Sequence, residues 1–283
     1  MNLKQTHWNP GHMHKAVQAI QEKLKWIDLL VVVLDARAMQ ACLTVPLTSQ
    51  KPTLFVVNKK DLADDRITQT NVQTLKQSGS HVVLTAGKQS GSRTQLLKAL
   101  HQLGEPIWQK QVAKGVKRQA LKVMITGVPN VGKSTIINLL AKQRKAVTEN
   151  RPGTTRGQQW IKLDELLLLL DTPGVLPPRF ISQTISTQLA LIGSMPLKQM
   201  PLKSLASYLY AWLKQSYPNV LTTQDGVMPI DEAAYFNNYG QKRGWMIKGQ
   251  LDEDRVYQTF IKSFQDGLLG PISLPTITDE KKH

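Results

Sequence analysis

The chain has 283 residues, 41% of them hydrophobic and 20% charged, which allows about two domains and an ordinary folded core. Its net charge of +16 favours a polyanionic partner, most often nucleic acid, over a face that only aids solubility. Its single cysteine, Cys42, excludes an internal disulfide and reads as a small buried residue, and its longest apolar runs are far shorter than the about 20 residues of a membrane span.

The first part of the chain alternates between helix and strand patterns. Hydrophobic residues at helical spacing predict a helix over 13–27, and an apolar run predicts a strand buried on both faces over 28–36. Further strands are predicted at 52–58, 81–86 and 121–126, further helices at 66–77, 94–103 and 133–141, and a strand hairpin at 158–163 and 166–171. This order predicts right-handed βαβ units, and therefore an α/β fold with a parallel sheet.

Two segments depart from this alternation. Residues 104–120 are rich in Lys and Arg and read as a connector, and prolines at 173, 177 and 178 end the strand pattern. Beyond them, helices are predicted at 182–192, 202–215, 231–239 and 252–266, with acidic residues near several helix starts. We therefore expect an α/β domain over 1–177 and a smaller, mostly helical domain over 178–283, whose tail after Pro275 is disordered.

Residues 127–134 match the pattern G-x-x-x-x-G-K-[ST]. A strand is predicted before this segment and a helix after it, which is the context of a phosphate-binding loop whose backbone N–H groups converge on phosphates. Lys133 is expected to reach the β- and γ-phosphates, and Ser134 to bind Mg²⁺. The predicted nucleotide contacts of this loop are Asn130, Val131, Gly132, Lys133, Ser134 and Thr135.

Two later segments complete the expected magnesium and γ-phosphate site. Asp171 begins a D-T-P-G motif at the end of an apolar strand, where its carboxylate would support Mg²⁺ and the Gly174 N–H would sense the γ-phosphate. The intervening loop contains P-G-T-T. We expect Thr155, or alternatively Thr154, to bind Mg²⁺ when the triphosphate is present.

A base-reading motif, N-K-x-D, occupies residues 58–61. Asp61 would accept the guanine N1–H and N2–H₂ bonds, Asn58 would donate to O6 or N7, and the stem of Lys59 would cover the base plane. Thr85 and Ala86 follow the next strand and would place backbone near guanine O6. The alternative is an ATPase in which this motif is an ordinary turn.

The motif order is N-K-x-D, T-A-G, phosphate loop, P-G-T-T and D-T-P-G. In most GTPases the phosphate loop precedes N-K-x-D, so the order of these two motifs is reversed here. It resembles the circularly permuted GTPases of the YlqF/RbgA family. An N-terminal W-N-P-G-H-M, a D-A-R at 35–37 and a G-L-L-G at 267–270 also resemble family motifs, although Asn9 and residues 38–43 depart from them. The resemblance implies a permuted, Ras-like three-layer P-loop GTPase domain followed by the helical domain.

The resemblance further implies a GTPase, slow alone and stimulated by ribosomal particles, that matures the large (50S) ribosomal subunit. Its partners would be the subunit precursor, rRNA and ribosomal proteins, and we expect a cytoplasmic monomer. Residue 175 is not the Gln that positions water in Ras-like enzymes. His12 of P-G-H-M is the candidate instead, its other reading being a helix-start or RNA-contacting histidine. Asn130 would support K⁺-stimulated hydrolysis, or simply cap the loop.

Positive charge is distributed unevenly between the two predicted domains. Residues 178–283 carry 11 Lys/Arg and 9 Asp/Glu, which leaves 25 and 11 for residues 1–177, a net of +14 against +2. The GTPase half is therefore also expected to touch rRNA. Two alternatives stay open: an RNA-binding factor in which GTP only regulates docking, and a permuted GTPase that acts on the small subunit. Permutation also makes the chain run from Gly174 straight into the helical domain. Loss of the γ-phosphate at Gly174 is therefore expected to change the affinity of the helical domain for the ribosome by a short covalent route.

Overall fold

The computed structural model describes residues 21–43, 49–86, 91–141, 160–170, 182–222, 230–247 and 249–277. Of the helix predicted over 13–27, residues 21–24 are helical, and Leu24 and Ile27 are buried in the core. The earlier residues of that helix lie outside the described ranges. None of the helices in these ranges is long and apolar enough to cross a membrane.

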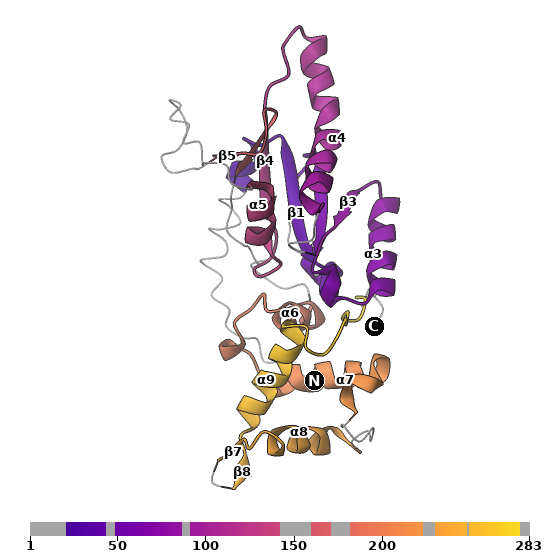
Figure 1. The fold of residues 1–283 in the computed structure, drawn as a ribbon, viewed down its shortest axis with the longest axis vertical. Helices are drawn as coiled ribbons and strands as arrows, with labels where there is room; N and C mark the ends of the chain where they lie inside the picture. The colour runs from indigo at the N-terminus through magenta and orange to yellow at the C-terminus, as the bar shows by residue number, and fades with distance from the viewer. Residues whose placement is uncertain are drawn as a thin grey trace.

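A six-stranded sheet forms the centre of the first part of the chain, in the order β3-β2-β1-β4-β6-β5 (Figure 1). Every neighbouring pair is parallel except β5 and β6, which form the antiparallel hairpin that the sequence predicts. β1 is buried along its whole length, as its apolar run requires. The strands are β1 (Leu29–Asp35), β2 (Thr53–Asn58), β3 (His81–Leu84), β4 (Leu121–Thr126), β5 (Trp160–Lys162) and β6 (Leu167–Leu170).

Helices pack against this sheet and confirm the α/β class. α4 contacts β1, β2 and β3 as well as α5, whereas α3 contacts β3. The short α2 carries Cys42, which is 2% exposed, and burial together with the nearby Asp35 raises the pKa of its thiol to about 12. The helices are η1 (Ala36–Ala38), α2 (Met39–Leu43), η2 (Lys60–Leu62), α3 (Asp65–Gln77), α4 (Ser92–Ala113) and α5 (Lys133–Ala141).

The predicted connector over 104–120 is wrong for its first half, because α4 continues to Ala113 with Pro106 inside it. Gly104 and Pro106 both look like helix breakers in the sequence. In the fold, however, a Cβ on Gly104 would lie 2.7 Å from the side chain of Leu121, so glycine permits close packing of α4 on β4. Trp108, one turn later, is fully buried. This packing outweighs the local helix propensity of the segment.

The second part of the chain is mostly helical, and the four predicted helices are confirmed. Asp231 and Asp252 cap α8 and α9 by accepting bonds from the backbone N–H three residues on. A small hairpin that the sequence did not indicate joins these two helices. The elements are α6 (Gln183–Leu191), η3 (Leu197–Gln199), α7 (Leu202–Ser216), η4 (Pro218–Leu221), α8 (Glu232–Gln241), β7 (Met246–Ile247), β8 (Gln250–Leu251) and α9 (Glu253–Gln265).

After α9 the chain returns to the α/β part and forms backbone bonds with it. Ile272 N donates to Leu62 O at 3.1 Å, and Leu274 N donates to Arg37 O at 2.7 Å. Ile277 packs against the core, so the predicted disorder after Pro275 does not begin there, and residues 278–283 lie outside the described ranges. The predicted boundary between 177 and 178 also lies outside them and stays a prediction.

Candidate functional site

The carboxyl ends of three adjacent strands bring the two main motifs together. β1 lies between β2, which ends at Asn58, and β4, which leads into the phosphate loop. Asp35, the last residue of β1, is in register with Asn58. Because parallel strands end at the same edge of a sheet, motifs about 70 residues apart in the chain meet there, which is where ligands bind open α/β sheets.

Glycines shape the phosphate loop at its two ends. Gly127 has a φ of 147°, and a Cβ there would lie 2.4 Å from Val33 O on β1. Gly132 has a φ of 99°, and its Cβ would lie 2.1 Å from Asn58 Nδ2. Both positions therefore exclude any side chain, because the backbone conformation and the neighbouring atoms each forbid it.

Asn58 is the bridge between the base-reading motif and the phosphate loop. Its Nδ2 donates to Val131 O at 2.9 Å, and its Oδ1 accepts from Thr85 Oγ1 at 3.0 Å. The side chain is only 2% exposed. Thr85 N in turn donates to Val57 O, which holds the segment after β3 against the same site and leaves Ala86 half-buried. Three predicted nucleotide loops thus converge on one amide group.

Lys59 adopts a left-handed backbone conformation with a φ of 59°. Its Nζ donates to Asn130 O at 2.7 Å and pairs with Asp35 Oδ2 at 2.8 Å. The side chain therefore crosses from the base-reading motif to the phosphate loop. Asp61 lies in η2 and is exposed, as a carboxylate that receives a ligand must be.

Asp35 is completely buried and is held by two cations. Arg37 donates from Nε to Oδ1 at 3.0 Å and from Nη2 to Oδ2 at 2.9 Å, while Lys59 contacts Oδ2. Burial alone would raise the pKa of Asp35, but Arg37 and Lys59 outweigh this effect and hold the pKa below its usual value. Sequence reasoning recognised D-A-R as a motif but gave Asp35 and Arg37 no role.

Arg37 extends this buried network to the helical part. Its Nη1 donates to Phe264 O and to Gln265 O, both at 2.9 Å, at the carboxyl end of α9. The guanidinium also lies over the Phe264 ring, 5.1 Å from its centroid. A cation at a helix carboxyl end satisfies carbonyls that have no partner in the helix and favours the helix dipole. The base-reading lysine is thereby connected to α9 through two side chains.

The start of α5 carries the remaining phosphate-loop residues. Lys133 is nearly buried, and its Nζ donates to Val128 O at 2.7 Å, which curls the side chain back over the loop. Ser134 is exposed and Thr135 is half-buried. The hydroxyl of Ser134 is therefore accessible in the first turn of a helix whose amino end is favourable for phosphate.

The phosphate loop also contacts the turn that follows α6. Asn130, with a φ of 61°, donates from Nδ2 to Gly193 O at 2.5 Å. Ser194 Oγ donates to Pro129 O at 2.8 Å. The helical part thus touches the phosphate loop directly, and the side-chain amide of Asn130 has a structural partner.

Five candidate residues lie outside the described ranges: His12, Thr154, Thr155, Asp171 and Gly174. The structure therefore brings together Asn58, Lys59, Thr85 and residues 130–133, and leaves the expected switch and water-orienting residues as predictions. Within the described ranges no group of three His, Cys, Asp or Glu side chains is placed to hold a metal.

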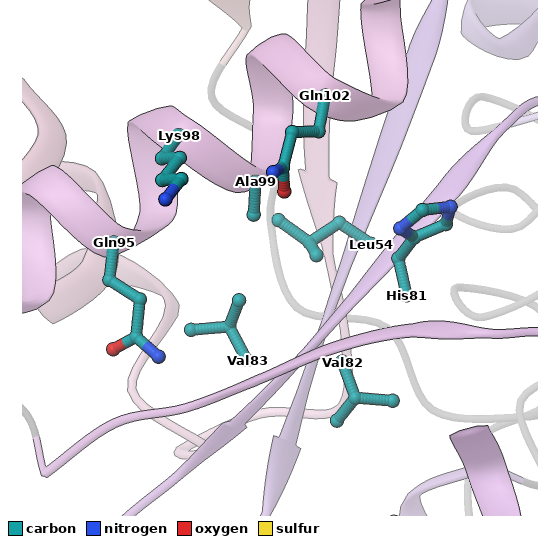
Figure 2. Close-up of a pocket in the computed structure, with 8 residues that line it drawn as sticks. All are labelled: Leu54, His81, Val82, Val83, Gln95, Lys98, Ala99 and Gln102. Carbon is teal, nitrogen blue, oxygen red and sulfur yellow. The ribbon is translucent and has the colours of Figure 1, made fainter.

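A cavity of about 200 Å³ lies elsewhere, between α4, the start of β2 and β3 (Figure 2). Leu54, Val83 and Ala99 contribute apolar side chains to its lining, and His81, Gln95 and Lys98 contribute polar ones. None of the residues that line it belongs to a nucleotide motif. The chemistry of the motifs, rather than this hollow, identifies the candidate site.

Comparisons with known proteins agree with the geometry. A family model described as a 50S ribosome-binding GTPase matches residues 122–209. The chain is 36% identical to ribosome biogenesis GTPase A of Bacillus cereus over 95% of this chain and 93% of the relative, and 31% identical to that of Thermotoga maritima over 94% and 92%. The structure of GNP-bound YlqF from T. maritima is similar with a TM-score of 0.69 and 29% identity, covering 92% of this chain and 97% of that one.

Proposed function

Because this chain belongs to the ribosome biogenesis GTPase A family, we propose that it binds and hydrolyses GTP as an assembly factor of the large ribosomal subunit. The observation that carries the proposal is the Asn58 bridge, which fastens a base-reading motif to a phosphate loop that follows it in the chain. The names of the relatives support the ribosomal target. Subunit precursors, rRNA and ribosomal proteins are the proposed partners, and a cytoplasmic monomer stays a prediction.

The proposed guanine contacts follow from the chemistry of the base. Asp61, exposed in η2, would accept the N1–H and N2–H₂ bonds of guanine, whereas adenine offers no matching pair of donors. The stem of Lys59 would cover one face of the base. Asn58 would share its amide between guanine and Val131 O, so its main contribution is to position the two loops.

The proposed phosphate and Mg²⁺ contacts begin at α5. Lys133 would exchange Val128 O for phosphate oxygens, and the accessible Ser134 hydroxyl would bind Mg²⁺. A hydroxyl with phosphate oxygens and one carboxylate suits Mg²⁺, a hard cation that prefers oxygen ligands. The remaining proposed contacts rest on the sequence alone: Thr155 and Asp171 would support Mg²⁺, and the Gly174 N–H would contact the γ-phosphate. Mg²⁺ would neutralise charge on the β- and γ-phosphates.

Replacing His12 with alanine should slow ribosome-stimulated GTP turnover by about 100-fold or more while leaving GTP affinity nearly unchanged, if His12 orients the attacking water. The measurement compares GTP hydrolysis by wild type and His12→Ala with and without large subunits, beside the neighbouring variant His14→Ala as a control. A variant that is stimulated as strongly as wild type would refute the assignment.

Asn130 is the proposed ligand of a K⁺ ion, which would bind its Oδ1 while Nδ2 donates to Gly193 O. If K⁺ binds there, hydrolysis should be faster in KCl than in NaCl at equal ionic strength. An Asn130→Ala variant should lose that difference. Equal rates of the wild type in the two salts would leave Asn130 with the structural contact alone.

The competing function is an RNA-binding factor in which GTP only regulates docking, and a second alternative is action on the small subunit. Both predict nucleotide binding. Hydrolysis measured with separated large and small subunits distinguishes them: the proposal expects stimulation by large subunits. No stimulation by either subunit supports the docking factor, and stimulation by small subunits alone supports the second alternative.

A further inference from the structure

The carboxyl-terminal end of α4 projects beyond the sheet. α4 has 22 residues, which is about 33 Å of helix, whereas the seven residues of β1 span about 23 Å. Figure 1 shows this end of α4 and the loop after it at one extreme of the long axis, with α8 and the β7–β8 hairpin at the other. We call residues 105–122 the basic knob.

The basic knob is strongly charged, and most of its cations face solvent. It holds five cations and one anion, Glu105, a net of +4 within 18 residues. Lys110, Lys114 and Lys117 are exposed, and no ion pair within the described ranges involves any of the three. One basic residue suffices to complement a helix carboxyl end, so the dipole of α4 does not account for this concentration.

The knob is also rigidly built, although its loop follows no regular pattern. Fully buried Trp108 donates from Nε1 to Gln119 O at 2.9 Å, and Gln119 N donates to Gln111 Oε1 at 2.9 Å. Arg118 bonds both carboxylate oxygens of Glu105, at 2.6 and 3.1 Å. These contacts fasten the loop to α4, so the lysines are presented on a fixed surface and not on a loose tail.

We infer that the basic knob binds the phosphate backbone of double-stranded RNA. The inference rests on the proposed function, since a factor of a ribosomal subunit works on a particle built largely of RNA. Fixed lysines without an exposed aromatic side chain suit a duplex, because single strands are usually held by stacking and Trp108 is buried here. An anionic membrane is the poorer fit, because a surface anchor needs exposed large apolar residues and the knob exposes only Val112 and Val116.

The knob lies at the opposite end of the long axis from the β7–β8 hairpin (Figure 1). An RNA duplex bound to the knob would therefore contact the protein far from the loops that hold nucleotide. The contact would therefore contribute affinity in both nucleotide states. Its strength would depend on salt, because each phosphate contact releases counterions.

The test uses the triple variant Lys110→Ala, Lys114→Ala, Lys117→Ala in the full chain. The probe is a 20-base-pair RNA duplex of mixed sequence, bound at several KCl concentrations. We expect the Kd to rise about 10-fold or more at moderate salt, and the slope of log K against log salt to fall by about 2 to 3, roughly one for each lost phosphate contact. Arg118 is left intact because it holds the loop.

The matched control removes the same charge elsewhere on the GTPase half, as Lys25→Ala, Arg66→Ala, Lys76→Ala, all at exposed positions. Both triple variants should keep the basal GTPase rate and the urea midpoint of wild type. The inference is overturned if the knob variant binds the duplex as wild type does or loses no more than the control. Two further probes are phosphatidylserine vesicles, for a membrane, and polyglutamate, for an acidic protein. The inference is also overturned if the knob variant loses affinity for one of these probes but keeps its affinity for the RNA duplex.

Co-sedimentation of wild type with large subunits is measured in parallel. If wild type sediments with them but the knob variant keeps its duplex affinity, the knob inference fails and the proposed function stands. If wild type does not sediment, the proposed function fails, and the duplex measurement still decides what the knob binds.

Discussion

Replacing Lys133 with alanine is expected to reduce GTP hydrolysis by about 100-fold or more. The side chain is nearly buried at the start of α5, and its ammonium already lies over the loop at Val128 O. A charge fixed in a site that excludes water stabilises developing negative charge far better than one in solvent, and loss of one such donor costs about 3–4 kcal/mol. The measurement is single-turnover hydrolysis with enzyme in excess over GTP.

The control for this variant is Lys162→Ala, since Lys162 lies on β5 and pairs on the surface with Glu165 at 2.7 Å. It should hydrolyse GTP at close to the wild-type rate. A Lys133→Ala rate within about twofold of wild type would show that the phosphate-loop lysine contributes nothing to the chemical step.

Replacing Arg37 with alanine is expected to destabilise the protein by about 3–5 kcal/mol, because it removes a partner from a buried charge. Asp35 would keep Lys59 alone, and the carbonyls of Phe264 and Gln265 would lose their shared donor. The measurement is the free energy of unfolding in urea. Arg118→Ala is the matched control: its pair with Glu105 is exposed and bidentate, so its loss should cost at most about 1 kcal/mol.

The pH dependence of the Arg37→Ala effect gives a second check. The pKa of Asp35 is lowered in the folded protein, so its ion pairs stabilise the fold above the usual value of 3.8 and cease to do so as the pH falls through the folded pKa. The difference in stability between wild type and Arg37→Ala should therefore be full at neutral pH and shrink in acid. A difference that is small at pH 7, or constant down to acid pH, would contradict the role given to the buried pair.

Local patterns in the sequence predicted the elements whose structure follows from local chemistry. β1 appears where the apolar run lies, and the acidic caps of α8 and α9 mark their starts. The extension of α4 past Gly104 was missed, because it depends on Trp108 being buried by the loop that returns 11 residues later. The β7–β8 hairpin was missed as well, since two-residue strands carry no periodicity.

The motif residues of the site could be recognised in the sequence, but their mutual contacts could not. Arg37 bonds a carbonyl 227 residues away, and Asn58 bonds one 73 residues away, so neither contact has a local signature. The D-A-R motif, which begins at the last residue of a buried strand, was the available signal for Asp35 and Arg37. In the fold it becomes the connection from Lys59 to α9.

The contacts of Arg37, Gly193 and Ser194 add further connections between the nucleotide loops and the helical part to the one that the permuted motif order predicts. The sequence suggested a route to the helical part through the segment after Gly174, which lies outside the described ranges. Within them, the helical part contacts the phosphate loop through Gly193 and Ser194, and the base-reading side through Arg37. Rearrangement of the phosphate loop by nucleotide would therefore reach the turn after α6, and rearrangement at Lys59 would reach α9 through Asp35 and Arg37.

The central claim is that nucleotide controls binding to the large subunit, and co-sedimentation with separated subunits tests it most directly. The wild-type protein should sediment with large subunits in a non-hydrolysable GTP analogue, much less so in GDP, and with small subunits in neither. Equal sedimentation with large subunits in the analogue and in GDP, or binding to small subunits instead, would contradict the account.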